Sequence, residues 1–413
     1  MKRAKSILLG VLAAAILSAP AAAQQRLTMW SRSTSEAFMP LLVNAFNEKH
    51  ATKIDLQIIP TGEMVQKYAT AAAGGSAPDF VSLDLVYTQA FAASGKIEDL
   101  TDLAKSLPYF DSLSKAHLGT ATYKNRIFAL PMSADASVLL WNKKLFKQAG
   151  LDPEKGPTNW AEIKEYAGKV EALGGNINGF YFPGACGGCN AFTFMPLIWA
   201  TVGDILVDGG KRATLDSPQM REAIQLYRDI VAAGYIPESA KTDAGANFFG
   251  GFANGTAGIA PGGAFAIGNL VKKYPDVEFG VTYLPGKTGG RASFAGGDNF
   301  LVTGGRKNLA AAKEFMSFVY SLEGQTLIAK AGSLPTRGDI AAEAVKDLDS
   351  RFLIATEAMK IGRTPISPVY NDLFNSSTGP WKQMLGDVFF GNDVDGALRQ
   401  AQKTMQQIID DAN

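Results

Sequence analysis

The apolar residues near the start of the chain follow a strand pattern and then a helical pattern. Residues 26–30 form a short apolar run that predicts a strand. Between Phe38 and Phe46, apolar side chains recur every three or four residues, which predicts one buried face of a helix. One of residues 33–35 is expected to cap this helix, because serine and threonine hydroxyls accept hydrogen bonds from free N–H groups. Residues 53–59 alternate apolar and polar side chains and predict a second strand.

Strands and helices continue to alternate along the chain. A helix is expected over residues 62–73 and a buried strand over residues 79–83. Three strands separated by helices predict a parallel sheet in an α/β fold. Further strands are predicted at residues 127–131, 137–141, 256–260, 278–284 and 299–303. Further helices are predicted at residues 143–148, 160–173, 191–202 and 218–232, the last capped by Asp216 or Ser217, and nearly the whole chain from Leu309 onward is expected to be helical.

The first 23 residues have the pattern of a secretory signal peptide. Lys2, Arg3 and Lys5 precede the apolar run Ile7–Leu17, and small residues follow up to Ala23. The apolar run is shorter than the roughly 20 residues that span a bilayer, so we expect cleavage after Ala23 rather than a retained anchor. No cysteine lies near the cleavage point, and no lipid anchor is expected. We therefore expect a protein that is free in the periplasm.

Removal of the signal peptide changes the charge of the chain. It takes away three basic residues, which leaves 37 basic against 39 acidic residues and a net charge of −2. A basic surface for a nucleic-acid backbone is therefore not expected. About 390 residues exceed the length at which a single core stops growing, so two lobes are predicted.

Cys186 and Cys189 are the two cysteines of the chain, in the sequence Cys-Gly-Gly-Cys. In an oxidising compartment they are expected to form a disulfide that holds one loop. The alternatives are a redox pair and half of a zinc site. A redox pair of the thioredoxin type requires the first cysteine to begin a helix after a strand, whereas the surrounding glycines indicate a loop. With two histidines and no second cysteine pair, a tetrahedral zinc site is not expected.

The motifs of common enzymes are missing from the sequence. There is no Gly-x-Ser-x-Gly and no His-Glu-x-x-His, and both His50 and His117 lie in polar segments that predict surface positions. Gly262-Gly263 and Gly304-Gly305 lack the Lys-Ser/Thr ending of a phosphate loop. Asp393-Val-Asp395-Gly396 is a fragment of a calcium loop and is better explained as a helix cap. We therefore expect a protein that is not an enzyme and has no cofactor or metal.

Polar and aromatic residues follow several predicted strands. In open α/β sheets, ligands bind beyond the carboxyl ends of the strands, where helix N-termini offer free N–H groups. Sugars need both carboxylate or amide groups for their hydroxyls and aromatic faces for their C–H surfaces. For each residue the alternative role is a helix cap or a core aromatic. The candidates are Ser31, Arg32, Asp84, Tyr87, Gly263, Phe265, Asp298 and Asn299.

Several segments, in order along most of the chain, resemble the carbohydrate-type extracellular solute-binding proteins of ABC importers, which have a maltose-binding-protein-like fold. The most specific segment runs from Ile127 through Leu139-Leu-Trp-Asn142 to Leu151, followed by Pro157-Thr-Asn-Trp160. The other similar segments are Leu27–Trp30, Ser76–Val81, Phe249–Phe265 and Leu309–Phe318.

The resemblance implies two α/β domains joined by a hinge that the chain crosses more than once, with the ligand cleft between them. The lobes would comprise residues 24–133 with 285–335 and residues 134–284 with 336–413. The protein would act as a monomer that delivers a small carbohydrate or polyol to the membrane subunits of the importer. By position, the resemblance implies that Arg32, Asp84, Asp135, Trp199, Gly263, Asp298 and Arg337 line the cleft, and Arg363 and Tyr370 complete the candidate set.

The expected mechanism is a clamp in which hinge closure completes the contacts with the ligand. Stacking on tryptophan would supply contact area, while Asp84, Asp298 and Arg337 would fix the orientation. Many relatives carry an aromatic residue where this chain has Asp298, which favours a smaller or hydroxyl-rich ligand. An anionic ligand held by Arg32, Arg337 and Arg363 is an alternative, such as a glycerol phosphate or a sulfonated or acidic sugar. A periplasmic glycan hydrolase or lyase is an alternative of another class.

Overall fold

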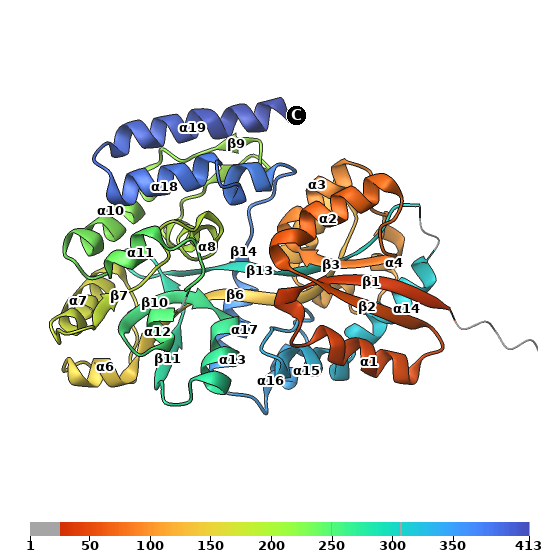
Figure 1. Ribbon diagram of the computed structural model, residues 1–413, viewed down its shortest axis with the longest axis horizontal. Coiled ribbons are helices and arrows are strands. Elements are labelled where there is room, and N and C mark those ends of the chain that lie inside the picture. Colours follow the sequence, from red (N-terminus) through yellow and green to blue (C-terminus); the bar gives the residue numbers. More distant parts are fainter. Residues whose placement is uncertain (1–24, 249, 306–307, 413) are drawn as a thin grey trace, which may run out of the picture.

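The computed structural model describes residues 25–248, 250–305 and 308–412, and these form two lobes side by side (Figure 1). The predicted signal peptide, residues 1–23, lies outside the described residues. Each lobe has its own core of buried apolar side chains. The smaller core takes residues from 27–132 and 300–328, and the larger takes residues from 134–294 and 329–409 together with Leu85 and Val86. The predicted two-lobed α/β architecture is confirmed.

The smaller lobe begins with the predicted alternation of strands and helices. Strand β1 (Arg26–Arg32) pairs in parallel with β2 (Lys53–Ile59) on one side and with β3 (Phe80–Asp84) on the other. Helices α1 (Met39–Lys49) and α2 (Thr61–Gly74) connect them. The predicted side-chain cap of α1 is wrong, since no side chain caps this helix. Residues Ser33–Ser35 form a short 3-10 turn instead, and the Ser35 hydroxyl faces the interior.

Two long antiparallel strands, β6 (Leu130–Asn142) and β13 (Arg291–Val302), run through both lobes (Figure 1). The prediction of two separate strands at 127–131 and 137–141 was wrong, because the intervening residues stay extended between buried neighbours. The strands pass from one core to the other near Ser133 and Gly297. Gly297 has φ +122°, and an added Cβ would lie 2.0 Å from the Ser133 carbonyl oxygen, so a side chain there would collide with β6.

The larger lobe extends the same sheet. The strand order is β2-β1-β3-β13-β6-β10-β7, where β10 is Ala257–Gly263 and β7 is Asn178–Phe180. Helix α10 (Pro218–Ala232) has the predicted bounds, and its predicted cap is confirmed at Ser217, whose hydroxyl accepts from the Met220 N–H. The predicted helix over 191–202 is instead α8 (Gly187–Thr193) and α9 (Met195–Trp199). Pro196 has no N–H to continue the first helix, which explains the break.

The chain from Leu309 onward is mostly helical, as predicted; its first two helices, Leu309–Val319 and Leu322–Lys330, contribute to the smaller core, and the later helices cover the larger lobe (Figure 1). The longest of these later helices are α17 (Arg351–Lys360), α18 (Pro380–Phe390) and α19 (Val394–Asp411). Asp393 caps α19 by accepting from the Gly396 N–H, as the sequence predicted. Among the residues that the structure describes, no helix has both the length and the apolarity that a bilayer crossing requires.

The remaining elements are short. The other strands are β4 (Thr122–Tyr123), β5 (Arg126–Ile127), β8 (Leu206–Val207), β9 (Arg212–Ala213), β11 (Phe279–Thr282), β12 (Leu284–Pro285) and β14 (Gly362–Arg363). The other α-helices are α3 (Thr88–Ala93), α4 (Thr101–Lys105), α5 (Lys115–Ala121), α6 (Lys143–Gln148), α7 (Trp160–Glu171), α11 (Glu238–Thr242), α12 (Gly250–Ala253), α13 (Ala264–Lys273), α14 (Leu309–Val319), α15 (Leu322–Lys330) and α16 (Ala341–Val345). Short turns of helix cover Leu85–Tyr87 (η2), Phe110–Ser112 and Asn371–Asn375 (η4, a π-helix).

Candidate functional site

A cleft of about 740 Å³ lies between the two cores, and residues of both lobes line it. Its volume lies within the range of roughly 300–1,000 Å³ that is usual for small-molecule sites. The ends of β1 and β3, together with Ser133 of β6 and Asp298 in the middle of β13, form one part of its wall. Helix α8, the start of α13, and segments around Gly245 and Tyr370 form the other part. This position is the one that the sequence predicted for the ligand cleft.

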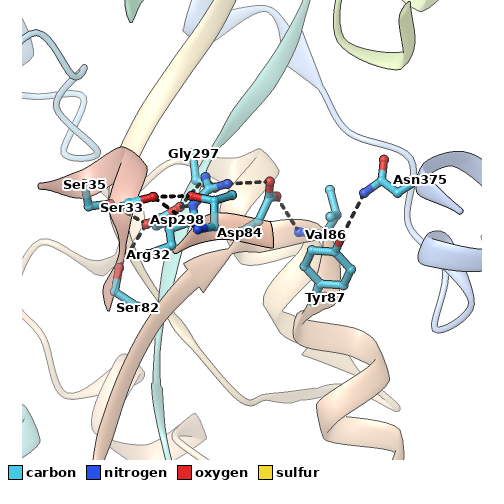
Figure 2. A network of polar contacts seen from close by, with 11 residues as sticks. Arg32, Ser33, Ser35, Ser82, Asp84, Val86, Tyr87, Gly297, Asp298 and Asn375 are labelled. Atoms are coloured by element: carbon cyan, nitrogen blue, oxygen red, sulfur yellow. Dashed lines mark hydrogen bonds and ion pairs between the residues drawn. The ribbon is translucent and has the colours of Figure 1, made fainter. Parts of the chain in front are cut away.

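A network of charged and hydroxyl groups joins β1, β3 and β13 in the first part of the wall (Figure 2). The Arg32 Nε donates to Asp298 Oδ1 at 2.5 Å, and one Arg32 terminal nitrogen donates to Asp84 Oδ2 at 2.9 Å. The other carboxylate oxygen of Asp298 accepts from the hydroxyls of Ser35 at 2.7 Å and Ser82 at 3.1 Å. All three charged groups therefore have partners inside the protein.

Burial and pairing oppose each other in this network. Burial acts to lower the pKa of Arg32, but the neighbouring carboxylates of Asp298 and Asp84 outweigh it and raise the pKa above its ordinary value. Burial also raises the pKa of Asp84, and the Arg32 charge opposes that rise. The guanidinium thus stays charged, and its donors are directed at residues of the chain rather than at an incoming anion.

Asp135 lies in the middle of β6, on the side of the cleft formed by the larger lobe, and it faces the start of α13. It accepts the N–H groups of Ala136, Ala264 and Phe265, and burial nevertheless raises its pKa to about 7. Gly263 explains how the carboxylate approaches so closely, since an added Cβ there would lie 2.9 Å from Asp135 Oδ2 and 2.5 Å from the Phe265 ring. A carboxyl group with this pKa can accept or donate a hydrogen bond near neutral pH.

Aromatic rings supply much of the remaining lining. Phe248 and Phe265 have ring centroids 5.5 Å apart, as do Phe192 and Phe294. The sequence prediction missed Phe192, Phe248 and Phe294. The alternation of strand side chains could have found Phe294, because it lies on the same face of β13 as Asp298.

A hydrogen bond between Asn375 and Tyr87 connects the two sides of the cleft (Figure 2). The Asn375 side-chain nitrogen, from the π-helix of the larger lobe, donates to the Tyr87 hydroxyl at 3.1 Å. Tyr87 lies beside Asp84, and both burial and the Asp84 charge raise its pKa, so the hydroxyl stays neutral. The sequence predicted Tyr87 but not Asn375.

The structure brings about half of the predicted site residues into the cleft lining. Ser31 and Asn299 are buried instead, because adjacent residues of a strand point to opposite faces and their neighbours Arg32 and Asp298 take the cleft side. The Asn299 amide nitrogen donates to the hydroxyls of two buried threonines. Gly263 adjoins the lining through Asp135. The predicted residues in the lining are Arg32, Asp84, Tyr87, Asp135, Phe265, Asp298 and Tyr370.

Trp199, Arg337 and Arg363 lie outside the cleft lining, contrary to the prediction. Trp199 stacks on the far side of the wall against Phe294 at 5.9 Å and donates to Asp204 at 3.1 Å. Arg363 pairs with the same aspartate. Arg337 pairs with Asp339 at 2.8 Å and lies over the Tyr109 ring. Each side chain therefore has partners away from the cleft.

The predicted disulfide between Cys186 and Cys189 is confirmed, but the predicted loop is wrong. Cys186 caps the start of α8, and its sulfur accepts the Cys189 N–H at 3.1 Å. Gly188 and Cys189 both line the cleft. The intervening glycines make this close packing feasible, since an added Cβ at Gly187 would lie 2.8 Å from the Phe374 carbonyl oxygen.

The prediction that His117 lies on the surface is wrong. Its side chain is fully buried, and burial lowers its pKa to about 4. Nε2 donates to the Ser133 carbonyl oxygen at 3.0 Å, which leaves Nδ1 to accept from the Ser114 hydroxyl. His50 is half-buried against Phe46. Within residues 25–248, 250–305 and 308–412, no three histidine, cysteine or acidic side chains gather as metal ligands would.

Solved structures with the same fold include sugar-binding proteins. An ABC transporter solute-binding protein from Thermotoga lettingae, bound with α-D-tagatose, is 24% identical and has a TM-score of 0.80, with 93% of this chain and 100% of that chain covered. UgpB from Mycobacterium tuberculosis, in complex with glycerophosphocholine, is 22% identical with a TM-score of 0.79 and coverage of 94% and 98%.

The sequence itself is similar to characterised binding proteins. The diacetylchitobiose-binding protein DasA of Streptomyces coelicolor is 25% identical over 392 residues, which is 92% of this chain and 89% of that protein. The family described as bacterial extracellular solute-binding protein matches residues 31–326. A match over this much of the chain, together with the two lobes and the cleft between them, leads to one conclusion. The chain belongs to the family of bacterial extracellular solute-binding proteins.

Proposed function

We propose that this chain is the substrate-binding component of an ABC importer, and that it captures a neutral, hydroxyl-rich carbohydrate or polyol. The observation that carries the proposal is a cleft between two separate cores, with carboxylates and hydroxyls on one side and aromatic rings on the other. Carboxylates accept hydrogen bonds from sugar hydroxyls, and aromatic faces cover the C–H side of the ring.

The charges of the cleft favour a neutral ligand over an anionic one. Its lining has three carboxyl groups, those of Asp84, Asp135 and Asp298, against the single cation Arg32. Arg32 pairs with two of these carboxylates. The two other arginines of the anionic hypothesis, Arg337 and Arg363, lie outside the lining. An incoming phosphate or sulfonate would therefore meet net negative charge.

Closure of the lobes is the proposed mechanism of capture. A ligand that contacts both walls favours the closed state through the contacts made only there. The chain crosses between the cores on β6 and β13, so we infer that bending takes place near Ser133 and Gly297, where the strands change cores. The lobe limits at residues 133, 285 and 335 stay a prediction. The presence of Ala292 and Phe294 in the larger core supports a crossing on β13 beyond residue 294.

We further infer that residues 1–23 direct export and that the mature protein works in the periplasm as a monomer beside the membrane subunits of the importer. Membership of an extracellular family supports this inference. The names of two relatives support the proposed class of ligand, since they state binding of diacetylchitobiose by DasA and of α-D-tagatose by the Thermotoga protein.

A thermal-shift panel tests the proposal. It includes D-tagatose, maltose, N,N′-diacetylchitobiose, sn-glycerol 3-phosphate and glycerophosphocholine. A ligand present at 100 times its Kd should stabilise the protein by about 2.7 kcal/mol. A shift with a neutral sugar, and a smaller envelope with that sugar in small-angle scattering, are expected. Stabilisation by sn-glycerol 3-phosphate alone would refute the proposal that the ligand is neutral. Cleavage of oligosaccharides during incubation would show that the protein is a hydrolase or lyase.

A further inference from the structure

We propose that the Cys186–Cys189 disulfide is a positioning element of the cleft, which seats the backbone at Gly245 and thereby places Phe248 in the aromatic wall. For its effect on ligand affinity, the inference rests on the proposed function. Both the disulfide turn and the segment that it would position line the cleft, through Gly188, Cys189, Gly245 and Phe248.

The contact between the disulfide and Gly245 is the first observation. An added Cβ at Gly245 would lie 2.9 Å from the sulfur of Cys186 and 2.9 Å from that of Cys189, so the glycine backbone packs directly against both atoms. Gly245 has φ +106°, a conformation that other residues rarely adopt. The position therefore admits neither a side chain nor a displacement of the sulfurs toward it.

The Gly245 segment is tied to the same part of the larger lobe by hydrogen bonds. Asp243 Oδ1 accepts the Gly245 N–H at 2.9 Å, and its other oxygen accepts the Tyr181 hydroxyl at 2.6 Å. The Ala185 N–H, next to the first cysteine, donates to the Asp243 carbonyl oxygen at 3.0 Å. From this support, the segment reaches Phe248, whose ring packs on Phe265. The position of the Gly245 segment relative to the disulfide therefore determines where the Phe248 ring lies in the aromatic wall.

The disulfide turn contacts a second segment of the cleft as well. An added Cβ at Gly188 would lie 3.1 Å from the side-chain oxygen of Asn375, and the nitrogen of that side chain donates to Tyr87 of the smaller lobe. Phe192, one turn further along α8, also lines the cleft. The helix that the disulfide begins therefore touches both the aromatic wall and the contact between the lobes.

Breaking the bond would move these parts for a steric reason. Bonded sulfurs lie about 2 Å apart, whereas unbonded heavy atoms approach only to roughly 3.5 Å. Reduction by dithiothreitol breaks the S–S bond, transfers two electrons and two protons to give two thiols, and leaves the reagent as a cyclic disulfide. The separated sulfurs then press on the Gly245 backbone. Because the chain has two cysteines in total, the reagent alters no other bond.

The test compares the oxidised and reduced full chain by hydrogen exchange and by sugar affinity. Reduction is expected to speed amide exchange at Gly245–Phe248 while exchange in β1–β3 stays unchanged. It should also weaken binding of whichever of D-tagatose, maltose and N,N′-diacetylchitobiose the oxidised protein binds most tightly, by roughly tenfold, the scale of a lost aromatic contact. Reoxidation should restore both. Faster exchange with unchanged affinity, or unchanged exchange, would overturn the proposal.

Matched glycine variants separate this role from general stability. Gly245→Ala keeps the disulfide but places a methyl group against it, and the same loss of affinity is expected. Gly234→Ala is the control, because Gly234 also has a positive φ of +76° but an added Cβ there meets no atom within 4 Å. Equal affinities of the two variants would refute the positioning role. This comparison needs no reduction, so it remains valid even when the reduced chain unfolds. If none of the three sugars binds the oxidised protein, the proposed ligand class fails, while the exchange measurement still tests the wall.

Discussion

The two walls of the cleft are built in different ways. On the wall from the smaller lobe, Arg32 pairs with both Asp84 and Asp298, and two serine hydroxyls complete the network. On the opposite wall, the carboxyl group is that of Asp135, which is held by main-chain N–H groups among aromatic rings. The first wall is fixed by contacts within the protein and can orient a ligand without rearranging. The second wall has apolar area to offer, so we expect most of the binding free energy to arise there.

The largest expected effect comes from breaking the charged network. Asp298→Ala removes one of the two carboxylates that Arg32 binds and leaves a buried guanidinium with one partner, which should cost about 3–5 kcal/mol of unfolding free energy. Denaturant unfolding measures it. Asp55→Ala is the control, since Asp55 forms an exposed ion pair with Arg26 and its loss should leave the unfolding midpoint unchanged. Equal unfolding midpoints for the two variants would show that the charged network does not stabilise this wall.

The aromatic wall should govern affinity more than stability. Phe265→Ala removes a half-buried ring at the start of α13, and we expect a loss of about 1.5–3 kcal/mol in ligand binding, the value of one large apolar side chain. Calorimetric titration with the best-binding sugar of the panel measures it. A variant that binds as tightly as the wild-type chain would show that the aromatic wall does not supply most of the binding free energy.

The pH dependence of stability should report Asp135. Its pKa is about 7 in the folded protein, above the value in the unfolded chain, because burial favours the protonated form. The folded state therefore binds more protons between pH 4 and 7, so this group's contribution to stability is full below pH 4 and is lost as the pH rises to 7. Asp135→Asn should remove this decline from the thermal midpoints. An identical slope in variant and wild type would show that Asp135 does not titrate in this range.

The smallest effect is expected outside the cleft. Arg363→Ala removes an exposed partner of Asp204, and affinity for the best-binding sugar should stay within a factor of about two, since surface pairs contribute little. A large loss would mean that the ligand reaches Arg363 and that the lining residues do not define the whole site.

The sequence predicted helices and strands better than it predicted which side chains face the cleft. The alternation at Lys53–Ile59 and the helical spacing at Pro218–Ala232 were sufficient, because both depend on neighbours along the chain. Ser31 and Arg32 are adjacent in sequence, yet only the second faces the cleft, and the pattern did not show which face of β1 the second lobe would leave open.

Long-range packing accounts for the other differences. Trp199 was predicted in the cleft by position and Arg363 as a contact to an anionic ligand. Their partners Phe294 and Asp204 lie far from them in the sequence, and no local pattern pairs these residues. The continuity of β6 was missed although Met132–Ala136 alternates apolar and polar residues. Its polar and small residues were assigned to a connection between two strands, and the burial of nearly every residue of β6 between the two lobes is not visible in the sequence.

The passage of β13 through both lobes has a consequence for the order in which the molecule is made. The smaller core needs side chains up to Ile328, which emerge from the ribosome only after residues 134–294 of the larger core. Neither half can therefore complete its interior as a stretch of continuous nascent polypeptide, and domains usually fold as units during synthesis. A truncation after residue 294 would deprive the first half of its central strand, so we expect such a fragment to aggregate rather than survive as an independent lobe.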